Sequence, residues 1–251
     1  MKRRQPGRRT APHGGFLTAT VLLLAVCGSR AAAEEPARET LARLREHLPR
    51  QRLVVEADLE LRDRDRRVER RWTLSMTCRW GDRPPGASIV LGDRFGERVA
   101  LLSMRGDSDG GCTWTFDPPD ADELLAEAGL APEDLSLSFL WWPRVRSAGA
   151  DTIKGRPCRI LDVEAPPDYD GAYRRVRLWV DREAPLLLQA RAYGGGGRLL
   201  RTMEVKSFRR VGKDTWTLLR AEWHEPDSGA QAVLHIRKAR PVPRREPSSR
   251  R

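Results

Sequence analysis

The chain has 251 residues, of which 39% are apolar, 6% aromatic and 32% charged, with a formal net charge of +11. This length fits one domain of ordinary size or two small ones, and no apolar run reaches the roughly 20 residues that a membrane-spanning helix needs. Collagenous and wholly disordered classes are excluded as well, because 21 glycines and 18 prolines are close to average usage.

The positive charge is concentrated at the two ends of the sequence. Residues 1–33 hold six basic residues and no acid, and residues 237–251 hold seven basic residues and one acid. The intervening body, residues 34–236, therefore has a net charge of about −1. A nucleic-acid-binding domain would carry a basic face on its folded part, so we expect no nucleic-acid partner.

The first 33 residues are typical of a secretory signal peptide. A positively charged segment at residues 2–9 precedes an apolar stretch at 16–27. Ala31 and Ala33 supply the small side chains of a cleavage site. We therefore expect export to the periplasm. A lipid anchor on Cys27 is the minor alternative, although Val26 is large for the position before a lipidated cysteine.

Three cysteines, Cys78, Cys112 and Cys158, remain in the exported chain. At most one intramolecular disulfide can form among them, and the pairing stays open. The simpler interpretation is that all three are small buried side chains. No Cys-x-x-Cys is present and the histidines lack ligand spacing, so we expect neither a metal nor a cofactor.

The pattern of apolar residues predicts a mainly β protein with a few helices. Residues 37–48 have the period of a short amphipathic helix, and residues 121–128 and 132–142 are predicted as two further helices. Alternating apolar and polar residues predict strands at 53–61, 68–78, 88–91, 98–104, 112–116, 158–163, 173–181, 185–193, 198–208, 215–224 and 230–237. We expect these to form an α+β fold, a half-open antiparallel β-barrel of about 10–11 strands over residues 34–240. Residues 241–251 are predicted to be a disordered basic tail.

No pattern in the sequence predicts catalysis. Asp120, Asp122 and Glu123 stand at a predicted helix start, where capping and the helix dipole explain them. The glycines at 194–197 lie between two strands rather than before a helix, so they predict a flexible hairpin and not a phosphate loop. We found no pairing of a nucleophile with a base, and we expect a protein that is not an enzyme.

The bulky apolar residues of the strands share one parity and should therefore share one face of the sheet. Only three short helices are predicted to cover that face, which leaves either a tight core or a cavity lined by apolar side chains. The candidate cavity residues are Trp72, Leu74, Met76, Leu137, Leu140, Trp141, Leu178, Val180, Leu188, Met203, Leu219 and Trp223.

The order of these elements resembles the outer-membrane lipoprotein-sorting proteins of the LolA-like superfamily. The local amino-acid sequence resembles that family in four segments, which are Asp134–Trp142, Lys154–Leu161, Val176–Asp181 and Tyr193–Leu200. The resemblance implies an incomplete barrel with a helical lid over an apolar cavity, and an arginine that holds the lid shut, which the sequence does not single out. It implies a monomeric periplasmic carrier or chaperone that binds lipoproteins or other acyl-chain ligands.

A second function fits the same expected fold. The chain would then be a regulator or interaction module that senses envelope stress and contacts an envelope membrane protein. Residues 135–142 hold more large apolar surface than one helical face can bury against a sheet, which predicts either a plug in the core or a lid that opens to a ligand. Pro132, Gly149 and Gly155 favour the lid, because they allow the segment to move without disturbing a strand.

Overall fold

The computed structural model describes residues 36–212 and 215–242. The predicted signal peptide with Ala31, Ala33 and Cys27, and the last nine residues, lie outside this part. Within it, no helix is long and apolar enough to cross a bilayer.

The described chain forms one antiparallel sheet of twelve strands in the order β5-β4-β3-β2-β1-β12-β11-β10-β9-β8-β7-β6. It consists of two meanders, β1 to β5 and β6 to β12, which join where β1 pairs with β12. β5 and β6 are the two edges, so the sheet does not close. The strands are β1 (Arg52–Arg62), β2 (Val68–Arg79), β3 (Gly86–Gly92), β4 (Arg98–Gly106), β5 (Cys112–Asp117), β6 (Arg144–Ile153), β7 (Arg156–Glu164), β8 (Arg175–Asp181), β9 (Leu187–Tyr193), β10 (Leu199–Arg210), β11 (Trp216–His224) and β12 (Gln231–Val242).

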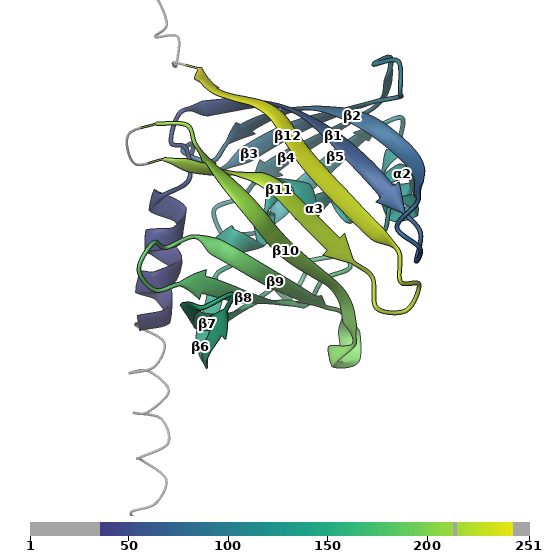
Figure 1. Cartoon of the computed structure of the whole chain (residues 1–251). Helices are drawn as coiled ribbons and strands as arrows, with labels where there is room; N and C mark the ends of the chain where they lie inside the picture. The colour runs from purple at the N-terminus through teal and green to yellow at the C-terminus, as the bar shows by residue number, and fades with distance from the viewer. Residues whose placement is uncertain (1–35, 213–214, 243–251) are drawn as a thin grey trace, which may run out of the picture.

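Helical segments pack on the inner face of this sheet. The chain between the two edge strands forms α2 (Ala121–Glu127), α3 (Pro132–Ser136) and the 3₁₀ helix η1 (Ser138–Trp141), and a further turn, η2 (Gly195–Gly197), lies between β9 and β10. Figure 1 shows the sheet curving around α2 and α3, with the N-terminal helix, described over residues 36–46, standing at one side.

The alternation of side chains along each strand builds the core. In β1, Leu53, Val55, Ala57, Leu59 and Leu61 point inward and are buried, whereas the residues between them are half-exposed. The side chains of the other strands alternate in the same way. Their inward residues and those of the helices form one main hydrophobic core. The predicted open antiparallel architecture is confirmed, because the strands pair antiparallel with their neighbours and the two edge strands, β5 and β6, leave the sheet unclosed.

Three predictions about the elements were wrong. The sheet has twelve strands rather than 10–11, because β6 was missed: its side chains are mostly exposed and show no apolar alternation. The predicted helix 132–142 breaks at Leu137, which has φ 56° and separates α3 from η1. The predicted tail begins two residues too early, since Pro241 and Val242 pair with Leu53 and Arg52 as the end of β12.

Candidate ligand-binding site

An apolar pocket lies where the N-terminal helix, η1 and the ends of β9 to β11 meet. Its free volume is about 40 Å³, enough for a few water molecules and far too little for an acyl chain. The inner face of the sheet is otherwise filled by core side chains. The pocket is lined by Leu44, His47, Leu48, Trp80, Leu137, Leu140, Pro185, Leu186, Leu187, Met203, Val205, Phe208, Trp216, Thr217 and Leu218.

The structure brings most of the predicted cavity residues into the main core. Three of the twelve, Leu137, Leu140 and Met203, also line the apolar pocket. Buried members of the core are Trp72, Leu74, Met76, Leu137, Leu140, Leu178, Val180, Met203 and Trp223, and Leu219 and Trp141 are partly buried against it.

Two predicted cavity residues are not in the interior of the main core: Leu188 lies outside it, and Trp141 is only partly buried against it. Leu188 packs with Cys158 and Trp179 in a separate small cluster, because an irregularity in the β8–β9 pairing makes Leu187 rather than Leu188 the partner of Val180. The predicted parity therefore fails at this position. Trp141 lines two surface grooves of about 810 and 540 Å³, beside the N-terminal helix and the β4–β5 turn, and does not line the apolar pocket.

A buried polar cluster ties residues 132–142 to the sheet. It consists of Glu133, Asp134, Tyr169, Tyr173 and Arg201. Arg201 Nη1 lies 3.1 Å from Asp134 Oδ2, and the Tyr173 hydroxyl donates a hydrogen bond of 2.6 Å to the same oxygen. The Tyr169 hydroxyl donates to Glu133. The sequence analysis missed this cluster, although Arg201 shares the inward parity of Met203 and could have been noticed as a charge at an apolar position.

The interior position of the cluster changes the acidity of its members. Burial raises the pKa of Glu133 and of Tyr169 above their usual values. Burial is the largest single effect and would lower the pKa of Arg201, but the charges of Asp134, Tyr173 and Glu225 and the hydrogen bond to Asp134 together outweigh it, so the net shift is upward. The guanidinium therefore stays charged, as its ion pair with Asp134 requires.

A second arginine contacts the same helical segment. Arg45 of the N-terminal helix donates a hydrogen bond of 2.6 Å from Nε to the carbonyl oxygen of Leu140. Burial lowers the pKa of Arg45. The Trp80 indole donates to the Ser136 carbonyl oxygen at 3.2 Å, so residues 132–142 are held from both the helix and the sheet.

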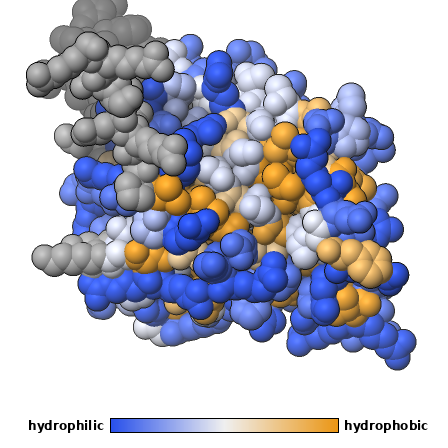
Figure 2. Space-filling model, turned by 90° about the horizontal axis from the view of Figure 1, so that it is seen from above, coloured by the Kyte–Doolittle hydropathy of each residue, from blue (hydrophilic) through white to orange (hydrophobic). Residues whose placement is uncertain are grey.

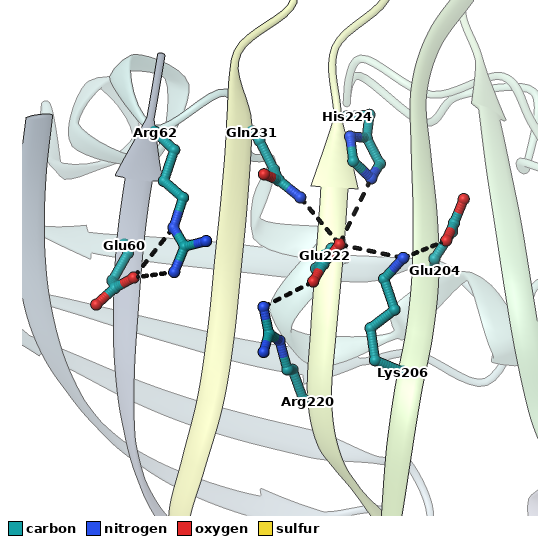
Figure 3. Close-up of polar contacts among 8 residues, drawn as sticks. All are labelled: Glu60, Arg62, Glu204, Lys206, Arg220, Glu222, His224 and Gln231. Atoms are coloured by element: carbon teal, nitrogen blue, oxygen red, sulfur yellow. Dashed lines mark hydrogen bonds and ion pairs between the residues drawn. The ribbon is translucent and has the colours of Figure 1, made fainter. Parts of the chain in front are cut away.

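On β1 and on β10 to β12 the outer face of the sheet is polar and internally paired, whereas on β7 to β9 it carries the small cluster of Cys158, Trp179 and Leu188. Glu222 of β11 accepts hydrogen bonds or ion pairs from Lys206 at 3.1 Å, Arg220 at 2.9 Å and Gln231 at 2.9 Å, and Glu60 of β1 contacts Arg62 at 2.6 Å (Figure 3). Carboxylates and cations satisfy one another here. These strands therefore present a solvated surface on this side, and the apolar pocket lies on the inner face.

The exposed surface also carries scattered apolar side chains. In Figure 2, hydrophilic side chains occupy most of the outline and an apolar area lies between them. The large hydrophobic residues that are exposed are Val68, Phe95 and Val99. Isolated residues of this kind are normal on soluble domains, and we assign no site to them.

The described cysteines form no disulfide. Cys78 and Cys158 are buried and Cys112 is half-buried, and all three are free. Burial raises the pKa of Cys78 to about 12, so its thiol is protonated and unreactive at neutral pH. Among the described residues, no group of three or more His, Cys, Asp or Glu side chains is placed to hold a metal ion.

We predict that Glu133 makes stability fall as the pH rises. Its pKa in the folded state lies above that of an unfolded glutamate, near 4.3, so the folded state binds the proton more tightly. This stabilisation is complete below the unfolded pKa and is lost as the pH rises through the folded pKa. The groups around Glu133 are Tyr169, Asp134, Arg201 and Cys112. Urea unfolding between pH 4 and pH 8 measures the dependence.

Glu133→Gln keeps an acceptor for the Tyr169 hydroxyl and removes the titration. We expect this variant to show a flatter pH profile, while Glu123→Gln, at an exposed position of α2, keeps the profile of the unaltered protein. An unchanged profile in Glu133→Gln would assign the pH dependence to other groups.

The fold belongs to the class of open antiparallel sheets that curve around helices on one face. Comparison with solved structures shows which known proteins share this fold. A DUF1329 family protein from Desulfovibrio piger is similar with a TM-score of 0.70 at 15% identity, over 83% of this chain and 93% of that one. A putative outer membrane lipoprotein-sorting protein domain from Vibrio parahaemolyticus is similar with a TM-score of 0.71 at 13% identity, over 85% and 95%.

A LolA superfamily protein from Nitrosomonas europaea is similar with a TM-score of 0.64 at 16% identity, over 82% of this chain and 94% of that one. The chain therefore has a LolA-like fold, as its sequence resemblance implied. A family model described only as an uncharacterized protein matches residues 125–243. Comparison with curated protein sequences gives no match.

Proposed function

We propose that the chain is an exported, non-catalytic binding protein that carries a lipoprotein or another acyl-chain ligand between the inner face of its sheet and residues 132–142. The observation that carries the proposal is the apolar pocket, whose lining residues come from the N-terminal helix, from η1 and from the inner face of β9 to β11. A pocket bounded by three separate elements enlarges when one of them moves, without breaking a strand.

In this proposal residues 132–142 are the lid, and the conformation described above is the closed one. Leu140 is fully buried and Leu137 nearly so, which means that an opened lid exposes apolar surface for a ligand to cover. Each Å² of apolar area that a ligand buries contributes about 25 cal/mol. An acyl chain is long and apolar, so it matches a site of this kind.

Arg201 and Arg45 are proposed as the residues that hold the lid closed. Arg201 pairs with Asp134 of α3, and Arg45 donates to the Leu140 carbonyl oxygen of η1. The two arginines come from different elements and hold opposite ends of the lid. The names of the similar solved structures, a lipoprotein-sorting domain and a LolA superfamily protein, support a role in the cell envelope.

Mass spectrometry of the protein purified from its native envelope tests the proposal. We expect a co-purified lipid or lipoprotein in molar amounts comparable to the protein. A stoichiometric protein partner without any lipid would contradict the carrier and favour a regulator on the same fold. A weakly bound ligand is lost during purification, so a preparation that contains neither lipid nor partner is then titrated with a fluorescent fatty acid. Failure to bind the fatty acid also contradicts the proposal.

A further inference from the structure

The two ends of the curved sheet differ strongly in charge. The strand ends and turns at the first end carry thirteen cationic and six acidic side chains, and they are residues 50–55, 79–83, 105–111, 151–156, 181–185, 209–212 and 237–242. The turns that join strands at the opposite end carry nine of each, and they are residues 62–70, 93–98, 166–174, 194–198 and 225–229. A general enrichment in arginine would make both ends equally positive. It therefore does not explain the difference in charge between them.

The excess charge is concentrated in one part of the first end. Residues 50–55, 79–83, 209–212 and 237–242 hold nine cationic side chains and one acid, and we call this part the basic end. The pairing of β1 with β12 places Arg240 opposite Val54, and Arg209 donates from Nη1 to the Arg237 carbonyl oxygen at 3.2 Å. Strands β10, β12 and β1 therefore bring these cations together, at the left side of the molecule in Figure 1.

Neighbouring acids neutralise only part of this charge. Arg237 Nε lies 3.3 Å from Asp58 Oδ2, and Arg79 Nε lies 3.9 Å from Asp82 Oδ2. Glu56 stands opposite Lys238 in the register of β1 and β12. Glu46 and Asp107 line the same groove as Arg50 and Arg83. Among the described residues, these five acids stand against nine cations, so the basic end keeps a positive excess.

Apolar and aromatic side chains are interleaved with these cations. Trp80, Phe208 and Trp216 are half-buried, and all three line the apolar pocket, which opens at this end. The Arg210 guanidinium lies 6.0 Å from the ring centre of Trp216. Aromatic rings beside arginines are the combination found at membrane interfaces, where the ring enters the headgroup region and the cation meets phosphate.

We propose that the basic end docks on a bilayer surface rich in anionic lipids. The positive excess matches the negative surface of such a bilayer. The half-buried aromatic side chains can also contact the apolar part of a bilayer, which a purely polar polyanion lacks. The pocket then faces the membrane. This inference does not require the carrier function, because surface binding follows from the charge and the half-buried aromatic side chains alone.

Co-sedimentation with vesicles tests the inference. The full chain is mixed with vesicles of phosphatidylcholine and phosphatidylglycerol at 70:30, and with pure phosphatidylcholine vesicles, in low salt and in about 0.5 M NaCl. We expect binding to the anionic vesicles at low salt, and loss of that binding in high salt, because the salt screens exposed charges beyond a few ångströms. Absence of binding to anionic vesicles at low salt would overturn the proposal.

Two matched triple variants locate the surface. Arg52, Arg209 and Arg240 are exposed residues of the basic end, and Arg67, Arg94 and Arg198 are exposed residues of the opposite end. Each set is changed to Gln, so both variants lose the same net charge. We expect the first variant to bind anionic vesicles about 100-fold more weakly and the second less than about threefold more weakly.

Equal losses in the two variants would show that net charge rather than the basic end governs binding, which contradicts the proposal. Tighter binding to a DNA duplex than to anionic vesicles would contradict it too, and would assign the basic end to a nucleic acid. Thermal melting of both variants confirms that each is folded before the comparison is made.

Discussion

Replacing Arg201 with Met is expected to lower the free energy of unfolding by about 3–5 kcal/mol. Arg201 and Asp134 are both buried, with side-chain exposures of 10% and 5%, and their charged atoms lie 3.1 Å apart. Removing the cation leaves the carboxylate of Asp134 in the interior with only the Tyr173 hydroxyl and the Ala131 amide as donors. Urea denaturation measures the loss.

The partner variant isolates the cause of this loss. Asp134→Asn combined with Arg201→Met removes both charges and keeps an oxygen that can accept from Tyr173, so we expect it to be more stable than Arg201→Met alone. Arg198→Met, at an exposed position before β10, is the control and should change stability by less than about 0.5 kcal/mol. If the double variant is as unstable as the single one, the lost packing of the Arg201 side chain explains the effect instead of the unpaired charge.

Leu140→Ala is the second large loss, at about 2–5 kcal/mol. Leu140 is 0% exposed and lies in the main core, and it also lines the apolar pocket, so its removal leaves a cavity that the neighbouring side chains do not refill. Its neighbour Trp141 is partly buried and lines only the surface grooves. We therefore expect Trp141→Ala to cost far less and to leave binding of a fluorescent fatty acid nearly unchanged.

Leu140→Met separates the size of the side chain from its position. A change that nearly conserves volume should cost less than about 1.5 kcal/mol and preserve fatty-acid binding. Melting and binding are recorded on the same samples of all three variants. If Trp141→Ala abolished binding without lowering stability, the ligand would contact the surface grooves and our placement of the site would be wrong.

The apolar period of the sequence predicted most of the sheet, and its failures have local physical causes. Strands β1 and β2 alternate cleanly because one face is buried and the other is wet. Edge strand β6 packs few side chains, so it has no alternation to detect. The irregular pairing of β8 with β9 shifted the parity at Leu188, and a single residue is enough to move a side chain to the other face.

The candidate site was less accessible to sequence reasoning than the fold. Met203, Leu137 and Leu140 were predicted and line the pocket. Met203 stood out by its inward strand parity, and Leu137 and Leu140 by the high apolar content of a short helical segment. Asp134 and Arg201 were not predicted as a pair, because 67 positions separate them and their meeting depends on the packing of α3 against β10. An acidic residue in the first turn of a helix is already explained by its favourable interaction with the helix dipole. Nothing in the sequence therefore pointed to a distant partner of Asp134.

The position of a bound acyl chain is the central claim, and fluorine NMR of tryptophan tests it directly. The chain has eight tryptophans. Trp80 and Trp216 line the apolar pocket, whereas Trp179 lies in the small cluster with Cys158 and Leu188. Each fluorotryptophan resonance is assigned by a single Trp→Phe variant, and a fatty acid with a spin label on its chain is then added.

We predict that the spin label broadens the resonances of Trp80 and Trp216 and leaves that of Trp179 sharp. A reduced, diamagnetic label should restore the broadened signals, which shows that proximity and not unfolding caused the change. Broadening of Trp179 with sharp signals from Trp80 and Trp216 would place the ligand outside the curved sheet and contradict the account.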